Sequence, residues 1–264
     1  MEQSVQIIED EAQKENVQLK RTFLKSLLLP FIFVFLLWIV EIVQLNSGFR
    51  LSSLGILPRV AEGLWGIITS PFIHAGYDHL LSNTLPLLLV GSGLYYFYPT
   101  LAGRVVILTW LFTGIWVWLA GRASSHIGAS GLVYGFVCFL FFSGLLRKDA
   151  RLIAISLLVT FLYGSLVWGI LPVDQSISWE SHLFGALAGI LCAVYYRNDG
   201  PQRPKTRWEI EEENGDDSSM DGVEFGPDLP EEKVKENSDP LPPPIQIRYH
   251  FKKDDDESPT DKGF

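Results

Sequence analysis

Residues 127–146 read IGASGLVYGFVCFLFFSGLL, a run of twenty residues without a charged side chain. An α-helix of about 20 consecutive, mostly apolar residues is long enough to cross the roughly 30 Å hydrocarbon core of a bilayer. The run therefore predicts a membrane-spanning helix, and this helix opens with a segment of small residues, GASG.

Five further segments are apolar over a similar length. With the first, they predict six membrane-spanning helices at residues 26–44, 80–97, 105–120, 127–146, 152–173 and 182–196. The expected fold is all-α: a multi-pass integral membrane protein whose six-helix bundle occupies residues 26–197. Six spans place both termini on the same side of the membrane.

Basic residues indicate which side that is, because Lys and Arg in short loops favour the cytoplasm. The loops on the side of the termini carry Lys14, Lys20, Arg21, Lys25, Arg104, Arg147, Lys148, Arg151, Arg197, Arg203, Lys205 and Arg207, and the other side carries Arg50, Arg59 and Arg122. Residues 1–25 and the C-terminal tail are therefore expected in the cytoplasm. The absence of a predicted seventh span favours the inner membrane of a bacterial cell.

The end of the chain differs sharply from the rest. Residues 198–264 hold nineteen of the 30 acidic and nine of the 21 basic residues, so this part has a net charge of −10 and the remainder +1. A segment rich in like charge, Pro, Gly and Ser cannot bury enough apolar surface to offset the entropy of ordering. Residues 198–264 are predicted to form a disordered acidic cytoplasmic tail.

The connection at residues 46–78 is apolar but is interrupted by Gly and Pro. This pattern favours short helices lying in the membrane interface over another crossing. Trp65 suits that location, because amphipathic rings collect at the level of the lipid headgroups.

Strongly polar side chains occur at the start of three predicted spans: His79 and Asn83, Ser130, and His182. Such residues are costly in lipid and are functional candidates by default. These three spans all run inward from the outer face, so their first turns share one depth and the four side chains can meet. His79 and Asn83 are spaced i, i+4 and share one helix face.

A serine and a histidine at one depth predict nucleophilic catalysis. A serine hydroxyl needs a neighbouring base to take its proton, and a neutral imidazole can do so near physiological pH. Ser130 and His182 are the expected nucleophile and base. The donors expected for the developing oxyanion are the Ser130 N–H, the His79 imidazole and the Asn83 amide.

Glycines make close approach of the two helices possible. Gly131 with Gly135, and Gly185 with Gly189, are small-xxx-small pairs, which allow tight helix contact in lipid. Gly128 and Gly131 flank the serine and leave room for the backbone of a substrate.

These motifs resemble the rhomboid family of intramembrane serine proteases. The family pattern is an HxxxN pair, a GxSG segment and a histidine followed by a glycine repeat. It is matched by His79 with Asn83, by GASG at residues 128–131, and by HLFGALAG beginning at His182. The resemblance covers residues 51–196.

The resemblance implies that Ser130 is the nucleophile, His182 the general base, and His79 and Asn83 oxyanion donors. Tyr134 is similar to an aromatic residue that packs against the catalytic histidine. Implied partners are single-span membrane proteins, cut at small residues near the outer face, and the surrounding lipids. No cofactor, metal or nucleic acid is expected, and a monomer should suffice.

One departure from the family pattern lies in the interfacial connection, where many rhomboids have a Trp-Arg pair and this chain has Trp65 and Gly66. We expect it to affect the stability of the connection rather than the chemistry. His74 is expected to have a structural role, and His126 is expected at the surface.

The sequence was also compared with what other functional classes of membrane protein require. A membrane zinc protease would need HExxH, which is absent, and a transporter would be expected to show an inverted repeat, which we do not find. Taken alone, GASG is a helix-packing motif. The alternative function is a rhomboid-like scaffold or chaperone that binds transmembrane helices without cleaving them.

Overall fold

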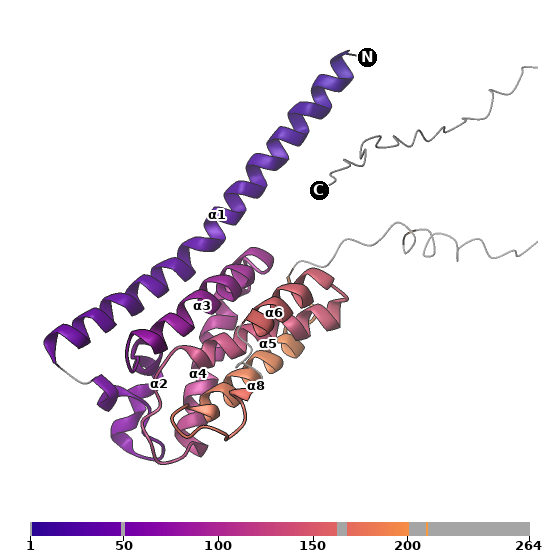
Figure 1. Cartoon of the computed structure of the whole chain (residues 1–264). Coiled ribbons are helices and arrows are strands. Elements are labelled where there is room, and N and C mark those ends of the chain that lie inside the picture. The colour runs from indigo at the N-terminus through magenta and orange to yellow at the C-terminus, as the bar shows by residue number, and fades with distance from the viewer. Residues whose placement is uncertain (1, 49–50, 163–167, 201–209, 211–264) are drawn as a thin grey trace, which may run out of the picture. The chain divides into compact units, whose positions relative to one another are not determined.

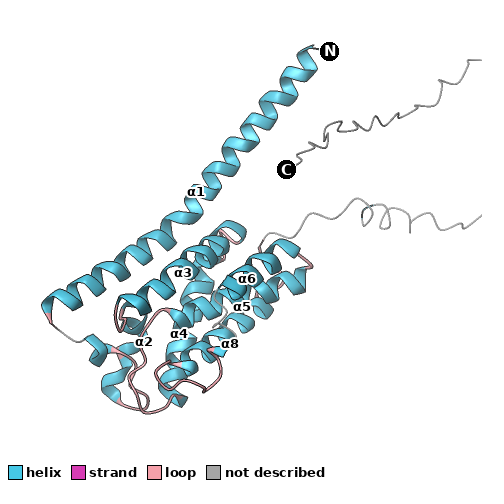
Figure 2. Cartoon of the chain, in the orientation of Figure 1, coloured by secondary structure: helices cyan, strands magenta, loops and turns pink. Residues whose placement is uncertain are grey.

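The computed structural model describes residues 2–48, 51–162, 168–200 and 210, with the backbone alone at residues 2–12. The chain divides into two units, Met1–Arg207 and Trp208–Phe264. The expected disordered tail lies outside the described residues except for 198–200 and Ile210. Within the described ranges the regular elements are helices (Figure 2), and one isolated β-bridge joins two loops.

Figure 1 shows the order of the helices. They are α1 (Glu2–Ser47), α2 (Gly66–Thr69), α3 (Tyr77–Phe97), α4 (Ala102–Ala120), α5 (Ser130–Arg147), α6 (Ala150–Leu162) and α8 (Trp179–Tyr195), with the 3-10 helices η1 (Leu51–Leu54), η2 (Ala61–Leu64) and η3 (Ser70–Phe72). The expected all-helical fold is confirmed, and the short helices predicted within residues 46–78 are present.

Four described helices are long and apolar enough to cross a membrane: Gln13–Ser47 of α1, together with α3, α4 and α5. The chain is an integral membrane protein. The other two expected spans correspond to shorter helices, because α6 has 13 residues and α8 has 17. At 1.5 Å per residue, α8 is about 25 Å long. The count of six spans stays a prediction.

Two helices differ from their predicted bounds. α1 begins at Glu2 rather than at residue 26, because residues 2–25 contain neither Gly nor Pro and are rich in good helix formers. Figure 1 shows this half of α1 extending beyond α3. In the described part, the span predicted at 152–173 is helical to Leu162 and again at Trp168; residues 163–167 lie outside it, and 169–173 form turns and bends.

α5 is the central helix of the bundle and contacts α3, α4, α6 and α8. Its core residues, Leu132, Val133, Phe136, Phe139 and Leu140, are all nearly or fully buried. Ser130 is the first residue of this helix. The helix that carries the predicted nucleophile is therefore held from several sides.

Glycines bring α5 and α8 into backbone contact. A Cβ atom on Gly185 would lie 2.0 Å from the carbonyl oxygen of Gly131, and one on Gly189 would lie 2.0 Å from that of Gly135. Neither position can hold a larger residue without separating the helices. The two predicted small-xxx-small pairs therefore face each other across a single seam.

The connection before α3 is fixed to α4 by two indole groups. Trp110 Nε1 donates to the Ile67 carbonyl at 2.8 Å, and Trp118 Nε1 donates to the Val60 carbonyl at 2.9 Å. Trp65, in contrast, is 73% exposed. The connection thus has one face attached to the bundle and one aromatic residue directed away from it.

Gly66 has a steric reason to depart from the family pattern. A Cβ atom there would lie 2.3 Å from the carbonyl carbon of Gly55 and 2.3 Å from the Ile56 nitrogen. Here two segments of the connection cross too closely for any side chain, so an arginine would require a different loop packing.

The seam between α5 and α8 predicts opposite effects for two glycine-to-alanine substitutions. Gly185→Ala should lower stability by about 1–3 kcal/mol, because the added methyl overpacks the seam. Gly103→Ala, on α4, should be neutral or stabilising by up to about 1 kcal/mol, since a Cβ there meets no atom within 4 Å. Thermal unfolding in detergent measures both. Equal melting temperatures for the two variants would contradict the close contact.

Candidate active site

Ser130 and His182 lie within hydrogen-bonding distance across the glycine seam. His182 Nε2 is 2.7 Å from Ser130 Oγ. The Tyr134 ring stacks on the imidazole with a centroid separation of 4.2 Å and an interplanar angle of 14°. The seam therefore places a serine hydroxyl, an imidazole and a supporting aromatic ring together. Their catalytic roles stay predictions.

The hydrogen bond made by the second ring nitrogen of His182 fixes the tautomer of the imidazole. Nδ1 lies 2.8 Å from the Gly169 carbonyl oxygen. A carbonyl oxygen only accepts hydrogen bonds, so this contact assigns the proton to Nδ1 and leaves the Nε2 lone pair facing the serine hydroxyl. This is the state in which an imidazole can act as a base.

Sequence reasoning missed Gly169. The sequence has no Asp beside His182, and the orienting group is a backbone carbonyl of the segment before α8. A backbone oxygen leaves no signature in the residue type. Only the close approach of the chain between α6 and α8 reveals it.

The start of α5 supplies backbone donors. The first N–H groups of a helix have no partner within that helix and carry its positive end, and Ser130 is the first residue of α5. The preceding turn is held by two hydrogen bonds: Gly128 N–H donates to the Ser70 carbonyl at 2.9 Å, and Ala129 N–H donates to His74 Nε2 at 3.4 Å.

His79 borders this turn. Ala75 N–H donates to its Nδ1 at 3.4 Å, which leaves Nε2 to carry the proton. Gly128 has φ = +107°, and a Cβ on it would lie 2.9 Å from His79 Nε2, so only glycine allows the ring this position. The imidazole edge therefore lies against the turn that presents Ser130.

Asn83 lies one helical turn after His79. Its Nδ2 donates to the His79 carbonyl at 2.9 Å, and an amide nitrogen carries a second N–H. Asn83 is 4% exposed. Both side chains line the same cavity as Ser130 and His182.

That cavity has a volume of about 590 Å³. Besides the predicted site residues, its walls include serines and other polar residues from two loops, residues 122–127 and 175–178. A cavity of this size, with polar and apolar side chains in its walls, has space for several water molecules. The predicted site residues therefore converge on one cavity.

His126 is not at the surface, so that expectation was wrong. It is 1% exposed, and its Nδ1 lies 2.6 Å from Ser178 Oγ. Burial lowers the pKa of His126. His126 precedes GASG in the sequence, but Ser178, in the loop before α8, contacts it. This contact joins residues far apart in the sequence, so the residue type alone could not predict it.

The chain matches the model of the rhomboid domain over residues 61–199. It belongs to the rhomboid family. This match confirms the resemblance first seen in the three motifs.

Three mycobacterial relatives resemble this rhomboid. The "Uncharacterized protein Mb1372" of Mycobacterium bovis and the "Uncharacterized protein Rv1337" of Mycobacterium tuberculosis are each 42% identical over 185 residues, covering 65% of this chain and 74% of theirs. The "Uncharacterized protein ML1171" of Mycobacterium leprae is 36% identical over 189 residues, covering 66% and 72%. The names of these relatives assign no activity.

The described part of this rhomboid contains no group of three or more His, Cys, Asp or Glu side chains placed to hold a metal ion. Cys138 and Cys192 are free thiols.

The stacked ring predicts a graded effect at Tyr134. Tyr134→Phe should leave the rate of reaction with a fluorophosphonate probe within about twofold of wild type, because the phenyl ring keeps the stack. Tyr134→Ala should lower the rate about tenfold, since aromatic stacking contributes about 0.5–1.5 kcal/mol beyond burial. In-gel fluorescence over time measures the rate. Equal losses in both variants would contradict a role for the stack.

His74 predicts a pH dependence of stability. It lies in the loop before α3, and burial, with the nearby His79, lowers its pKa to about 3 from the ordinary 6.5. Below pH 6.5 the unfolded chain binds a proton that the folded chain does not, so stability should fall as pH decreases from 6.5 towards 3, by up to about 1.4 kcal/mol per pH unit.

The test compares melting temperatures of wild type and His74→Gln from about pH 7 to about pH 5. The variant should be less stable at neutral pH but should lose less on acidification. Identical pH slopes in the two proteins would contradict a buried neutral His74.

Proposed function

We propose that this rhomboid is an intramembrane serine endopeptidase that hydrolyses peptide bonds in or near transmembrane helices through a Ser130/His182 dyad. One observation carries the proposal: His182 Nε2 lies 2.7 Å from Ser130 Oγ while Nδ1 bonds the Gly169 carbonyl. A helix-packing serine would not need an imidazole held in the tautomer of a base.

In the first half of the reaction, Ser130 Oγ attacks the scissile carbonyl carbon as its proton passes to His182 Nε2. The carbonyl oxygen becomes an oxyanion beside the Ser130 N–H, the His79 Nε2–H and the Asn83 amide. Collapse of this intermediate breaks the C–N bond, and the leaving amine takes the proton from His182. The product is an ester between Ser130 and the acyl part of the substrate.

In the second half, water in the site cavity attacks the ester carbon. His182 takes a proton from that water and returns one to Ser130 Oγ as the ester bond breaks. The carboxylic acid product leaves and the dyad is restored. No cofactor is needed, because each proton moves between Ser130, His182, water and the substrate.

The proposed substrates are single-span membrane proteins. A peptide carbonyl must leave its helical hydrogen bond to reach Ser130, so the cut segment must unwind near the membrane surface. Small residues suit the space beside Gly128, where His79 lies against the turn. Membrane lipids surround the bundle, and one chain contains the whole dyad, which supports an active monomer.

Residues 1–25 and 198–264 are proposed to lie in the cytoplasm of a bacterial cell, with residues 26–197 as the protease domain in the inner membrane. The excess of Lys and Arg on the side of the termini supports this orientation. The dyad then lies towards the outer face, at the starts of α5 and α8.

The proposal predicts that Ser130→Ala and His182→Ala each lower cleavage of a single-span reporter at least about a thousandfold. The measurement uses purified full-length protein in proteoliposomes. The control is Ser143→Ala, a serine-to-alanine change on the same helix but remote from His182, which should keep cleavage within about twofold of wild type.

Cleavage that persists in folded Ser130→Ala would refute the dyad. A folded wild type that retains the reporter without cutting it would favour the alternative, a non-cleaving scaffold or chaperone for transmembrane helices.

A further inference from the structure

Two loops far apart in the sequence form one side of the site cavity. The first precedes α5 and contributes Arg122, Ser124, Ser125 and Ile127. The second, residues 175–178, precedes α8 and is named the wall segment. Neither loop belongs to a helix, so hydrogen bonds outside the helices hold this side of the cavity in place.

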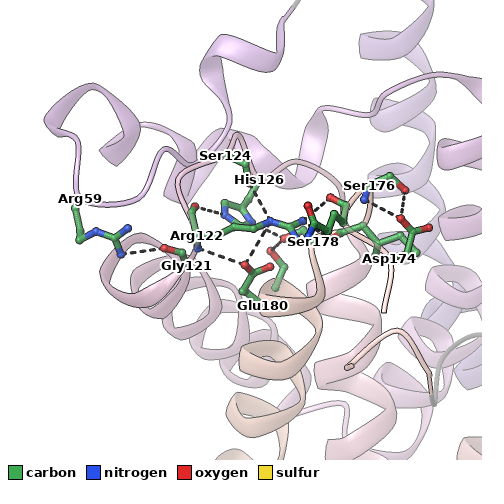
Figure 3. Close-up of polar contacts among 12 residues, drawn as sticks. Arg59, Gly121, Arg122, Ser124, His126, Asp174, Ser176, Ser178 and Glu180 are labelled. Atoms are coloured by element: carbon green, nitrogen blue, oxygen red, sulfur yellow. Dashed lines mark hydrogen bonds and ion pairs between the residues drawn. The ribbon is translucent and has the colours of Figure 1, made fainter. Parts of the chain in front are cut away.

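Arg122 makes most of these contacts (Figure 3). Its Nη2 donates to the Gln175 carbonyl at 2.8 Å and to the Ile177 carbonyl at 2.6 Å. Its Nε lies 3.5 Å from Glu180 Oε1, and its own backbone N–H donates to the same oxygen at 3.3 Å. One guanidinium therefore joins the wall segment to the first turn of α8.

Burial strengthens this connection. Glu180 is 3% exposed, and removing the partner of a buried charge leaves that charge uncompensated, which is strongly destabilising. The planar guanidinium presents several N–H groups in fixed directions, which suits one carboxylate and two carbonyls at once. A lysine ammonium at the same position lacks that geometry.

A second contact fixes the end of the wall segment. Ser178 Oγ lies 2.6 Å from His126 Nδ1 and 2.6 Å from Ser181 Oγ. His126 Nε2 lies 3.1 Å from the Arg122 carbonyl oxygen, which returns the chain of hydrogen bonds to the first loop. Ser181 directly precedes His182, so the network reaches the backbone that carries the proposed base.

We propose that Arg122 is a positioning residue of this site: its guanidinium holds the wall segment against the cavity and anchors it to the start of α8. The inference rests on the proposed protease function for its kinetic consequence, because Arg122 acts through the wall segment and Glu180 rather than on the reacting atoms. It extends that function by assigning a role to a residue outside the predicted dyad and oxyanion donors.

The test uses Arg122→Gln, which removes the charge, and Arg122→Lys, which keeps it without the planar geometry. The matched control is Arg59→Lys. Arg59 also donates to backbone carbonyls, that of Leu119 and that of Gly121, the second of which is drawn in Figure 3, and these contacts do not involve the wall segment. All variants are made in the full chain, and their melting temperatures are compared.

The first readout is amide hydrogen exchange at residues 175–178, which needs no catalytic activity. Arg122→Gln should raise the exchange rate about 10- to 100-fold, the range expected when charge-assisted hydrogen bonds are lost. Arg122→Lys should give an intermediate increase, and Arg59→Lys should leave exchange within about twofold of wild type. Unchanged exchange in Arg122→Gln would overturn the proposal.

The second readout is reporter cleavage in proteoliposomes. Arg122→Gln should lower kcat about tenfold with KM within about threefold, since the proposed role of Arg122 is to position the wall segment and the start of α8 rather than to bind the substrate. Faster exchange with unchanged kcat would overturn the positioning role. If wild type cuts no reporter, the proposed function fails, and the exchange data alone still decide whether Arg122 anchors the wall segment.

Discussion

The backbone contact between α5 and α8 is the constraint on which the site depends. Gly185 and Gly189 bring α8 against the carbonyl oxygens of Gly131 and Gly135, with no space for a Cβ atom. In lipid, where apolar surfaces gain little by meeting each other, close packing of this kind is a main source of helix association. The same contact that stabilises the pair sets the 2.7 Å separation between Ser130 Oγ and His182 Nε2. Stability and the geometry of the dyad therefore have one origin.

Backbone groups and loops complete what the two helices begin. The Gly169 carbonyl orients His182, and the turn before Ser130 is held by Ser70 and His74. Above the site, Arg122 links two loops to a buried carboxylate at the start of α8. His182, His74 and Glu180 are all buried, and buried polar groups need hydrogen-bond partners, which the chain supplies here. The polar network around the dyad is thus part of the fold.

Much of this arrangement could be predicted from the sequence, because its strongest signals are local. The lengths of the apolar segments predicted four spans that the structure supports, and three spaced motifs predicted the family. What depends on long-range contact could not be predicted: the burial of His126 under Ser178, the carbonyl of Gly169 as the orienting group, and the crossing that requires Gly66. The helix at residues 2–25 of α1 was not predicted, because the prediction rested on apolar length and this part of α1 is polar. Hydropathy identifies helices in lipid and says little about helices outside it.

The most direct test of an activated dyad is to locate a fluorophosphonate adduct by peptide mapping and mass spectrometry of the full-length protein. We predict one adduct on Ser130 Oγ in wild type and none in folded His182→Ala, because an isolated serine hydroxyl is a poor nucleophile. Folded wild type without an adduct on Ser130, or equal modification of Ser130 without His182, would contradict it.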